Sequence, residues 1–279
     1  MEELVCAECG SEDLRLVTKL EDGRRRIACN DCQHEWVRGE ATIVPKPVDT
    51  FATAKARFAD SATVEPGRAA RVEALKTVFL REHPSPDPTA ETFWARYQQV
   101  FSADGLATAK PEDFHYFANS SIGANPGNMS VFNTEWAAIG ADEGARRVRE
   151  ATDYLLYGPE TTPLEDRLSR LIEPGNQLGM KGWKEALLTK TLCIMQPERF
   201  LPILTYTSPN GGKKELARAI WGIDLPDPNK VAWRIGRLIL WANDVLVELA
   251  GDGFASPTRM AQFMWMAKDR EAELRDPPA

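Results

Sequence analysis

The sequence of 279 residues has no long apolar run and no recognisable secretory signal. Every apolar stretch falls short of the roughly 18 residues that a membrane-spanning helix needs. The N-terminus is acidic, whereas a signal peptide begins with basic residues followed by an apolar segment. Hydrophobic residues make up 43% of the chain and charged residues 27%, as in ordinary globular proteins. We therefore expect a cytoplasmic protein without a membrane partner.

Histidine is also scarce, and the motifs of common enzyme classes are missing. His34, His83 and His115 form none of the spacings that hold a catalytic metal. No lysine follows an acidic residue by two positions, so the acid-x-Lys element of many restriction-type nucleases is absent. The Gly-x-Ser-x-Gly and Gly-x-Gly-x-x-Gly motifs are absent as well. We expect a protein that is not an enzyme; a site assembled from distant carboxylates is the alternative.

Only five cysteines occur, but four of them stand in a metal-binding pattern. Cys6 and Cys9 form one Cys-x-x-Cys pair, Cys29 and Cys32 form a second, and 19 residues separate the two pairs. This spacing is typical of a structural zinc site, because each pair makes a tight turn that brings both sulfurs to one ion. Two disulfides are the alternative, but they require an oxidising compartment. We predict one structural Zn²⁺ bound by all four cysteines.

The residues around the cysteines predict a small β-hairpin. Leu14 and Leu16 alternate with polar residues, and Asp22-Gly23 is a strong signal for a two-residue turn. A third strand is expected around Trp36. Residues 1–40 resemble a zinc ribbon, a class found in transcription factors, polymerase subunits and bacterial regulators. The resemblance implies a metal-dependent fold, and it leaves open whether the ribbon binds nucleic acid or protein.

The charge of the chain argues against a broad nucleic-acid-binding surface. The net charge is −7, and residues 1–40 contain ten acidic and six basic side chains. A zinc ion with four thiolates adds about −2. The local exception is the run Arg24-Arg25-Arg26 beside the hairpin turn. We predict that Arg24, Arg25 and Arg26 contact phosphate, with a solvated strand edge as the alternative.

Residues 41–66 are expected to form a linker with a short helix, since prolines interrupt its first part. Beyond it, apolar residues recur at helical spacing. We expect residues 67–279 to form an all-α domain of about eight helices, in one or two lobes. The chain is thus predicted to be mainly α, with a small β zinc ribbon in front. The expected helices include 68–82, 89–102, 142–157, 210–221 and 229–250, and residues 119–130 are expected to form a long exposed loop.

Two glycine-containing segments of this domain combine backbone N–H groups with positive charge. In the first, Gly211-Gly212 precedes Lys213 and Lys214 at an expected helix start. The segment lacks the first glycine and the Ser/Thr of a P-loop, but a helix N-terminus with two lysines favours an anion. We predict phosphate contacts by Lys213 and Lys214; an ordinary exposed helix cap is the alternative.

The second segment is Leu178–Ala186, which resembles a helix-hairpin-helix motif. Such a motif presents the backbone amides of a glycine turn to a DNA phosphate. The segment departs from the motif by one extra residue, Lys181, inside the turn. The resemblance implies nucleic-acid contacts by Lys181, Trp183 and Lys184, with packing in the core as the alternative for Trp183.

The same region carries a second resemblance. The run Pro197-Glu198-Arg199-Phe200-Leu201-Pro202 looks like part of the N-terminal regions of Mcr-type restriction and related AAA+ defence proteins. In those proteins, a glycine-rich turn leads into a helix that ends in Pro-[Asp/Glu]-[Arg/Lys]-Phe-x-Pro. The match is close over residues 178–203 and loose over 90–270. These regions precede a motor and are associated with target recognition, so the resemblance implies a targeting module.

These features together predict a zinc-containing, non-enzymatic module that binds nucleic acid, most simply DNA, in a restriction or defence system. The helical domain would be the main reader and the ribbon an accessory. A motor or nuclease is the expected protein partner. The alternative is a protein-interaction adaptor whose acidic ribbon docks on a partner. The net charge favours the adaptor, whereas the lysines at two helix starts favour nucleic acid.

Overall fold

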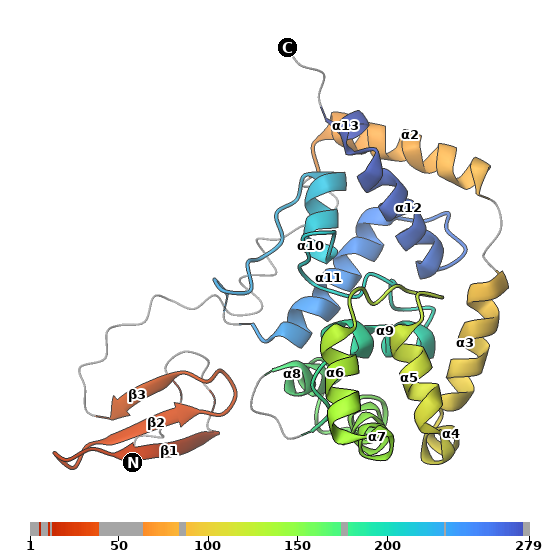
Figure 1. Ribbon diagram of the computed structural model, residues 1–279. Helices are drawn as coiled ribbons and strands as arrows, with labels where there is room; N and C mark the ends of the chain where they lie inside the picture. Colours follow the sequence, from red (N-terminus) through yellow and green to blue (C-terminus); the bar gives the residue numbers. More distant parts are fainter. Residues whose placement is uncertain are drawn as a thin grey trace. The chain divides into compact units, whose positions relative to one another are not determined.

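The computed structural model describes residues 6, 11, 13–38, 64–83, 88–173, 178–231 and 233–275, which belong to two compact units (Figure 1). The ribbon unit comprises residues 1–57 and 226–234, and the helical unit comprises residues 58–225 and 235–279. The described residues are mainly helical with one small antiparallel sheet, which confirms the expected fold class. The expected domain boundaries stay a prediction, because residues 39–63 lie outside the described part. No described helix is long and apolar enough to cross a bilayer.

The ribbon unit contains a three-stranded sheet in the order β1-β2-β3. Strands β1 (Leu14–Lys19), β2 (Arg25–Cys29) and β3 (Glu35–Arg38) pair antiparallel. The predicted hairpin is present, but its turn runs through Glu21, Asp22 and Gly23, because the N–H of Leu20 donates to the carbonyl of Arg24 at 2.8 Å. Gly23 takes a φ of +84°. Three-residue loops end in such a left-handed residue, and glycine adopts it at least cost.

A β-bulge interrupts the pairing of β1 with β2. Leu16 pairs with Ile27, and beyond the bulge Lys19 pairs with Arg25 in a register shifted by one residue. Ile27 and Arg25 are two positions apart on β2 and therefore share a face. Leu16 and Lys19 are three positions apart, so in a regular strand they would face opposite sides. The bulge brings both of them to the face of Arg25 and Ile27.

The helical unit is built from helices that start at prolines and polar caps. Proline stands in the first turn of α2, α5 and α12, where its missing N–H costs no hydrogen bond. The carboxylate of Glu65 accepts from Gly67 and Arg68 at the start of α2, and Ser256 caps α12. The helix expected at 210–221 is a short α-helix that continues as a π-helix, η2. The elements are α2 (Pro66–Glu82), α3 (Pro88–Val100), α4 (Ala103–Thr108), α5 (Pro111–Asn119), α6 (Ser130–Ile139), α7 (Ala141–Tyr157), α8 (Leu164–Ile172), α9 (Glu185–Met195), α10 (Lys213–Leu216), η2 (Ala217–Trp221), α11 (Ile235–Ala250), α12 (Pro257–Asp269) and α13 (Glu271–Leu274).

The helix expected from residue 229 begins only at Ile235. The residues before it form a turn, in which Asp227 accepts the N–H of Asn229 on its carboxylate at 3.0 Å and the N–H of Lys230 on its carbonyl at 2.9 Å. An aspartate that binds nearby N–H groups competes with helix formation. The segment 226–234 instead belongs to the ribbon unit.

Helix α9 forms the centre of the helical unit. Its residues 187–194 are all buried, and α3, α7 and α8 pack against it. Beside it, the rings of Tyr97, Phe101 and Phe117 form a cluster with centroids 4.7–5.6 Å apart. Aromatic rings at these spacings add to the stability that burial provides. The buried side chains of α9 are therefore part of the core and do not line a surface site.

Candidate metal centre and nucleic-acid interface

Three cysteines of the ribbon unit converge on one point. The Sγ atoms of Cys6, Cys29 and Cys32 all lie within 4.8 Å of one another, and those of Cys6 and Cys32 are 3.4 Å apart. A disulfide would bring two sulfurs to about 2.0 Å, whereas tetrahedral metal–sulfur bonds of about 2.3 Å separate the sulfurs by about 3.8 Å. The three thiols are thus placed to bind one metal ion. Cys9, the fourth predicted ligand, lies outside the described residues.

Backbone hydrogen bonds shape the turn that carries the second cysteine pair. The N–H of Gln33 donates to the carbonyl of Cys29 at 3.0 Å, and the N–H of Cys29 donates to the carbonyl of His34 at 2.9 Å. Gln33 takes a φ of +59°, the single positive value among the described non-glycine residues. This left-handed residue lets the chain fold back after Cys32. The backbone by itself therefore keeps Cys29 and Cys32 close together.

Side chains tie this turn to other parts of the ribbon unit. Asn30 donates its backbone N–H to the carbonyl of Asp13 at 2.9 Å and its amide to the Asp13 carboxylate at 2.8 Å. The hydroxyl of Ser11 donates to the carboxylate of Asp31. Asp31 also lies 3.5 Å from the guanidinium of Arg234, in the segment 226–234. The turn between Cys29 and Cys32 is thus a meeting point for segments that are far apart in sequence.

A row of positive charge crosses the sheet at the end of β2 away from Cys29. Arg25 lies opposite Lys19 of β1 and opposite Arg38 of β3, and all three side chains are exposed. We call Lys19, Arg25 and Arg38 the cationic row. Within the described part of the chain, none of the three forms an ion pair with an acidic side chain. Like charges directly opposite one another destabilise a sheet, so the row costs stability in the isolated protein.

Of the three arginines predicted to contact phosphate, Arg25 alone belongs to the cationic row. Arg24 pairs with Asp22 at 2.7 Å, and hydrogen bonds from its backbone N–H and guanidinium lower the pKa of Asp22. Arg26 lies on the other face of β2, opposite Val37.

Sequence reasoning missed Lys19 and Arg38 as partners of Arg25. A two-residue turn would have placed Leu20 opposite Arg25, and the additional turn residue places Lys19 there. One residue of turn length therefore decides whether the row exists.

The structure removes Lys213 from the anion site predicted at the start of α10. Lys213 is fully buried, its Nζ donates to the carbonyl of Ile203, and burial lowers its pKa to about 8. The N–H of Gly212, which an anion would need, donates to the carboxylate of Glu215 at 2.9 Å. A phosphate at this helix end would meet the carboxylate of Glu215, and it could not reach the amine of Lys213. A contact by the half-buried Lys214 stays a prediction.

The segment that resembles a helix-hairpin-helix has its glycine turn, but the turn is packed against the protein. Gly182 takes a φ of +87° and lies so close to α6 that a Cβ would approach the Cα of Phe132 to 2.4 Å. Trp183 is only 1% exposed, so the prediction that it contacts nucleic acid is wrong. Lys184 donates to a carbonyl in the last turn of α8 at 2.6 Å, and burial lowers its pKa. Lys181 is exposed, and its contact stays a prediction.

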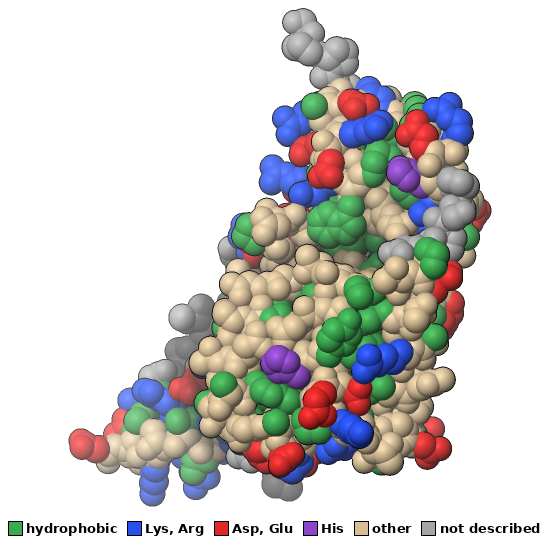
Figure 2. Space-filling model, turned by 45° about the vertical axis from the view of Figure 1, so that its right-hand side comes forward, with side chains coloured by type: hydrophobic (Ala, Val, Ile, Leu, Met, Phe, Trp, Pro, Cys, Tyr) green, Lys and Arg blue, Asp and Glu red, His purple; other side chains and the backbone are tan. Residues whose placement is uncertain are grey.

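The helical unit shows no continuous basic patch on the face seen in Figure 2. Acidic and basic side chains are interspersed, and a broad area in the middle of the face carries few charges. The ion pairs of α7 illustrate the mixing, since Arg146 lies 2.7 Å from Glu143 and 2.5 Å from Glu150. Mixed charges of this kind give no net attraction for a polyanion.

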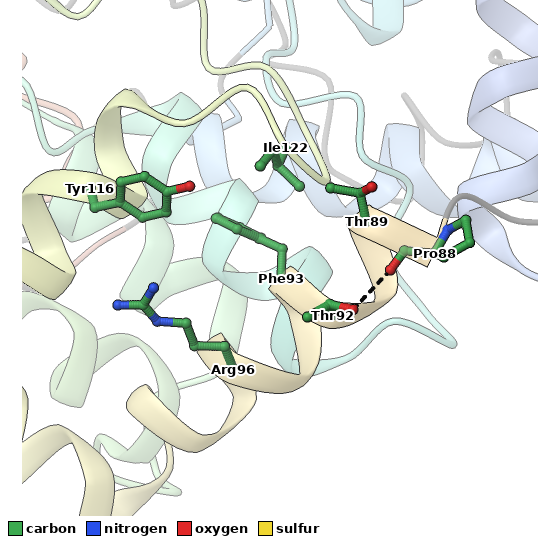
Figure 3. Close-up of a pocket in the computed structure, with 7 residues that line it drawn as sticks. All are labelled: Pro88, Thr89, Thr92, Phe93, Arg96, Tyr116 and Ile122. Carbon is green, nitrogen blue, oxygen red and sulfur yellow. Dashed lines mark hydrogen bonds between the residues drawn. The ribbon is translucent and has the colours of Figure 1, made fainter.

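The helical unit also holds an open cavity of about 430 Å³ between α3, α5 and the loop after α5 (Figure 3). The guanidinium of Arg96 lies 5.5 Å from the ring centroid of Tyr116 and donates to the carboxylate of Asp113 at 2.7 Å, which raises the pKa of Arg96. The ion pair cancels the charge that Arg96 brings to the cavity, and no sequence motif marks the site. The described residues that line it are Pro88, Thr89, Thr92, Phe93, Arg96, Tyr116 and Ile122.

The described residues contain two candidate sites, and both belong to the ribbon unit. One is the cysteine cluster of Cys6, Cys29 and Cys32, which could bind a metal ion. The other is the cationic row, whose positive charges have no acidic partner among the described residues. In the helical unit, the predicted nucleic-acid contacts are reduced to Lys181 and Lys214. The resemblance to Mcr-type proteins stays a prediction. No protein-family model, no curated protein and no solved structure matches this chain.

Proposed function

We propose that this protein is a zinc-binding, non-enzymatic module that binds nucleic acid through its ribbon unit. The observation that carries the proposal is the cationic row, which lies exposed at one end of β2. The other end of this strand carries Cys29 of the cysteine cluster. Opposed like charges cost stability in the isolated protein, and phosphates that bind there remove the repulsion and release counterions. The cationic row is therefore more stable with a phosphate backbone bound to it than when water alone surrounds it.

Zinc is the metal that the ligand set favours. Thiolates are soft ligands, and a tetrahedral set of them is typical of zinc or iron–sulfur sites. Cys6, Cys29 and Cys32 would bind the ion, with Cys9 as the fourth ligand. The ion would hold the two cysteine segments together and complete a unit whose apolar core is too small to fold alone. Four thiolates leave no open position for a substrate, which supports a structural role.

The proposal moves the expected interface from the helical domain to the ribbon. Lys184 and Lys213 use their amines inside the fold, and Trp183 is buried. With a net charge of −7 on the chain, binding to phosphate requires a local concentration of positive charge, and the cationic row supplies one. The helical unit would then bind a protein partner, such as the motor or nuclease that the Mcr-type resemblance implies.

Titration of labelled DNA at several salt concentrations tests the proposal. The logarithm of the association constant falls with the logarithm of salt concentration, with a slope of about −0.7 to −0.9 per phosphate contact. Arg25→Ala and Arg38→Ala should each make the slope shallower by about that amount. Arg81→Ala removes an exposed arginine of α2, 72% accessible, and should leave the slope unchanged. A flat slope for the unmodified protein, or no binding at low salt, overturns the proposal.

Metal analysis tests the zinc assignment separately. Purified protein should contain one zinc ion per chain by elemental analysis. Cys29→Ser should lose the ion, because the remaining thiolates no longer complete a tetrahedral site. Cys193→Ser is the matched control: Cys193 is fully buried in the helical unit and donates to the carbonyl of Leu201 at 3.2 Å. Iron in place of zinc, or zinc retained by Cys29→Ser, contradicts the assignment.

A protein-interaction adaptor is the second candidate, and β1 supports it. Leu16 is 59% exposed and Val17 is 38% exposed on this strand. The first 40 residues also contain more acidic than basic side chains. Exposed apolar side chains on a segment with net negative charge suit a partner with a basic, partly apolar surface. The salt titration separates the two candidates, because the adaptor predicts no salt-dependent DNA binding and no effect of Arg25→Ala on it.

A further inference from the structure

The cationic row has an apolar and aromatic row beside it on the same face. Leu16, Ile27 and Trp36 lie opposite one another on β1, β2 and β3. They share the face of the cationic row because alternate residues of a strand point the same way and because the bulge in β1 realigns Leu16 with Lys19. Leu16 is 59% exposed, and Trp36 is partly exposed. One face thus combines three cations with an accessible aromatic ring.

A neighbouring ring fixes the orientation of Trp36. His34 lies two positions earlier on the same face, and its ring stacks on the indole with centroids 5.6 Å apart and planes 17° apart. The stack restricts the side-chain torsions of Trp36 before any ligand is present. A ring that is already held in place loses less conformational entropy when a planar ligand stacks on it.

We propose that this face binds single-stranded nucleic acid, with phosphates on the cationic row and bases against Trp36 and Leu16. The inference rests on the proposed function and names its ligand. Neighbouring strands are about 4.8 Å apart, so the cationic row spans about 10 Å, the reach of a short stretch of sugar–phosphate backbone that crosses the sheet. Proteins that bind single strands without sequence preference combine a positive track for the backbone with aromatic side chains for the bases.

A duplex suits the same face less well. Its bases are stacked on one another, so their flat sides are not available to Trp36. Proteins that hold a duplex by its phosphates make about six to ten contacts, whereas the cationic row supplies three cations. A duplex on this face would also cover Leu16 and Trp36 without giving either a base to contact. Few cations next to an accessible ring therefore favour the single strand.

Fluorescence anisotropy with the zinc-loaded full chain tests the inference. The probes are a labelled oligothymidine of about 20 nucleotides and a duplex of the same length, which exceeds the site size of small single-strand-binding folds. We expect the single strand to bind at least about ten-fold more tightly than the duplex, with a salt slope near −2, or about −0.7 for each cation. Trp36→Leu should weaken single-strand binding about ten-fold and leave the slope unchanged, because stacking involves no counterions. Lys19→Ala should instead make the slope shallower.

Matched variants separate stacking from folding. Zinc content shows whether Trp36→Leu still folds its ribbon, and Trp36→Phe should keep most of the affinity because a phenyl ring still stacks. Trp265→Leu removes a tryptophan of α12 that is 36% exposed and should leave binding unchanged.

Each outcome has a defined meaning. If the unmodified protein binds the duplex as tightly as the single strand, or if zinc-loaded Trp36→Leu binds like the unmodified protein, the inference is wrong and the proposed function stands. If neither probe binds, both fail. The comparison of the two probes needs no variant, so a variant that does not fold leaves the test intact.

Discussion

Lys190 places an amine in the centre of the helical unit. It is fully buried, and its Nζ donates to the carbonyl of Ser120 at 2.5 Å and to that of Phe117 at 3.2 Å. The Nζ also lies 4.9 Å from the ring centroid of Phe117 and 5.1 Å from that of Phe93. Burial lowers the pKa of Lys190 to about 7. The side chain therefore acts mainly as a hydrogen-bond donor that holds the end of α5, and its charge is a cost.

The lowered pKa predicts how the stability of the helical unit depends on pH. The pKa of Lys190 is about 7 in the folded protein and near 10.5 in the unfolded chain, so between these values the unfolded state binds more protons. Stability rises with pH in such a window. Lys190→Met should remove about 2 kcal/mol of the rise in unfolding free energy between about pH 7 and pH 9. Urea denaturation at both pH values measures the difference, with the exposed Lys181→Met as control. An equal rise in Lys190→Met and the unmodified protein would show that Lys190 keeps its charge when folded.

Gly182 is a position where no other residue fits. Its φ is +87°, and an added Cβ would lie 2.4 Å from the Cα of Phe132, a backbone atom that cannot move aside. Gly182→Ala should therefore lower the unfolding free energy by about 3 kcal/mol or more. Gly127→Ala is the matched control, since Gly127 has a similar φ of +79° but nothing within 4 Å of the added Cβ. It should cost only about 1 kcal/mol. Chemical denaturation of both variants measures the contrast, and equal losses would mean that the turn is less tightly packed than described.

At the scale of elements, basic side chains complete the ends of the helices. The last carbonyls of a helix have no partner inside it and carry partial negative charge. In the helical unit, a lysine or arginine from another element often donates to them. This use of positive charge explains why lysines that looked like surface residues lie inside the fold. The donors are Arg68 at η2, Arg71 at α13, Lys76 at α11, Arg149 at α4, Arg167 at α7, Lys184 at α8 and Lys190 at α5.

Two arginines of α7 show how much this role matters. Arg149 donates to the carbonyls of Leu106 and Ala109 at 2.8 and 2.9 Å and is half-buried. Arg146 forms ion pairs with Glu143 and Glu150, but its side chain is 52% exposed. Arg149→Ala should lower the unfolding free energy by about 2–3 kcal/mol, because two carbonyls lose charged donors. Arg146→Ala should change stability little, because exposed ion pairs contribute little. Thermal denaturation of the two variants measures the loss of stability in each. A larger loss for Arg146→Ala than for Arg149→Ala would contradict the prediction.

The sequence predicted the type of most elements because their signals are local. Prolines, polar caps and apolar periodicity lie within a few residues of the helix that they define, as at α2 and α12. Contacts between distant residues carry no such signal. Arg68 donates to the carbonyl of Ala219, 151 positions away, and no pattern near either residue indicates the pairing. Lys184 and Lys213, which were predicted to contact nucleic acid, donate to distant carbonyls instead, and no local pattern indicates these bonds either.

The features of the candidate site also differ in whether a local sequence signal predicts them. The spacing of the cysteines is local, and the structure brings Cys6, Cys29 and Cys32 together as the spacing predicts. The cationic row depends on the length of one turn. The position of Leu16 on the same face as this row depends on one bulge in β1. A pattern-based prediction cannot resolve a shift of a single residue, although that shift decides which side chains share a face. Arg25 was therefore identified without its partners Lys19 and Arg38.

At the scale of the whole molecule, the two units differ in how much apolar core they contain. Ile27, Ala28 and Val37 are buried in the sheet of the ribbon unit, whereas the helical unit buries several helix faces and an aromatic cluster. Among the described residues of the ribbon unit, the other large apolar side chain that is buried is Trp233. A small core of this kind does not reach the stability needed to fold alone. Metal binding supplies the missing free energy in such units. The ribbon unit should therefore depend on its metal, and the helical unit should not.

Calorimetry with and without a zinc chelator tests this difference. The metal-loaded protein should show two transitions, because its two units are separately compact. Excess chelator should abolish the transition of the ribbon unit and shift that of the helical unit by less than about 2 °C. Cys29→Ser should reproduce the chelated state, because it breaks the same site. The segment 226–234 belongs to the ribbon unit but lies between η2 and α11 in the chain, so it could transmit a loss of metal to the helical unit. If the transition of the helical unit falls together with that of the ribbon unit, this segment couples the two, and the metal stabilises the whole protein.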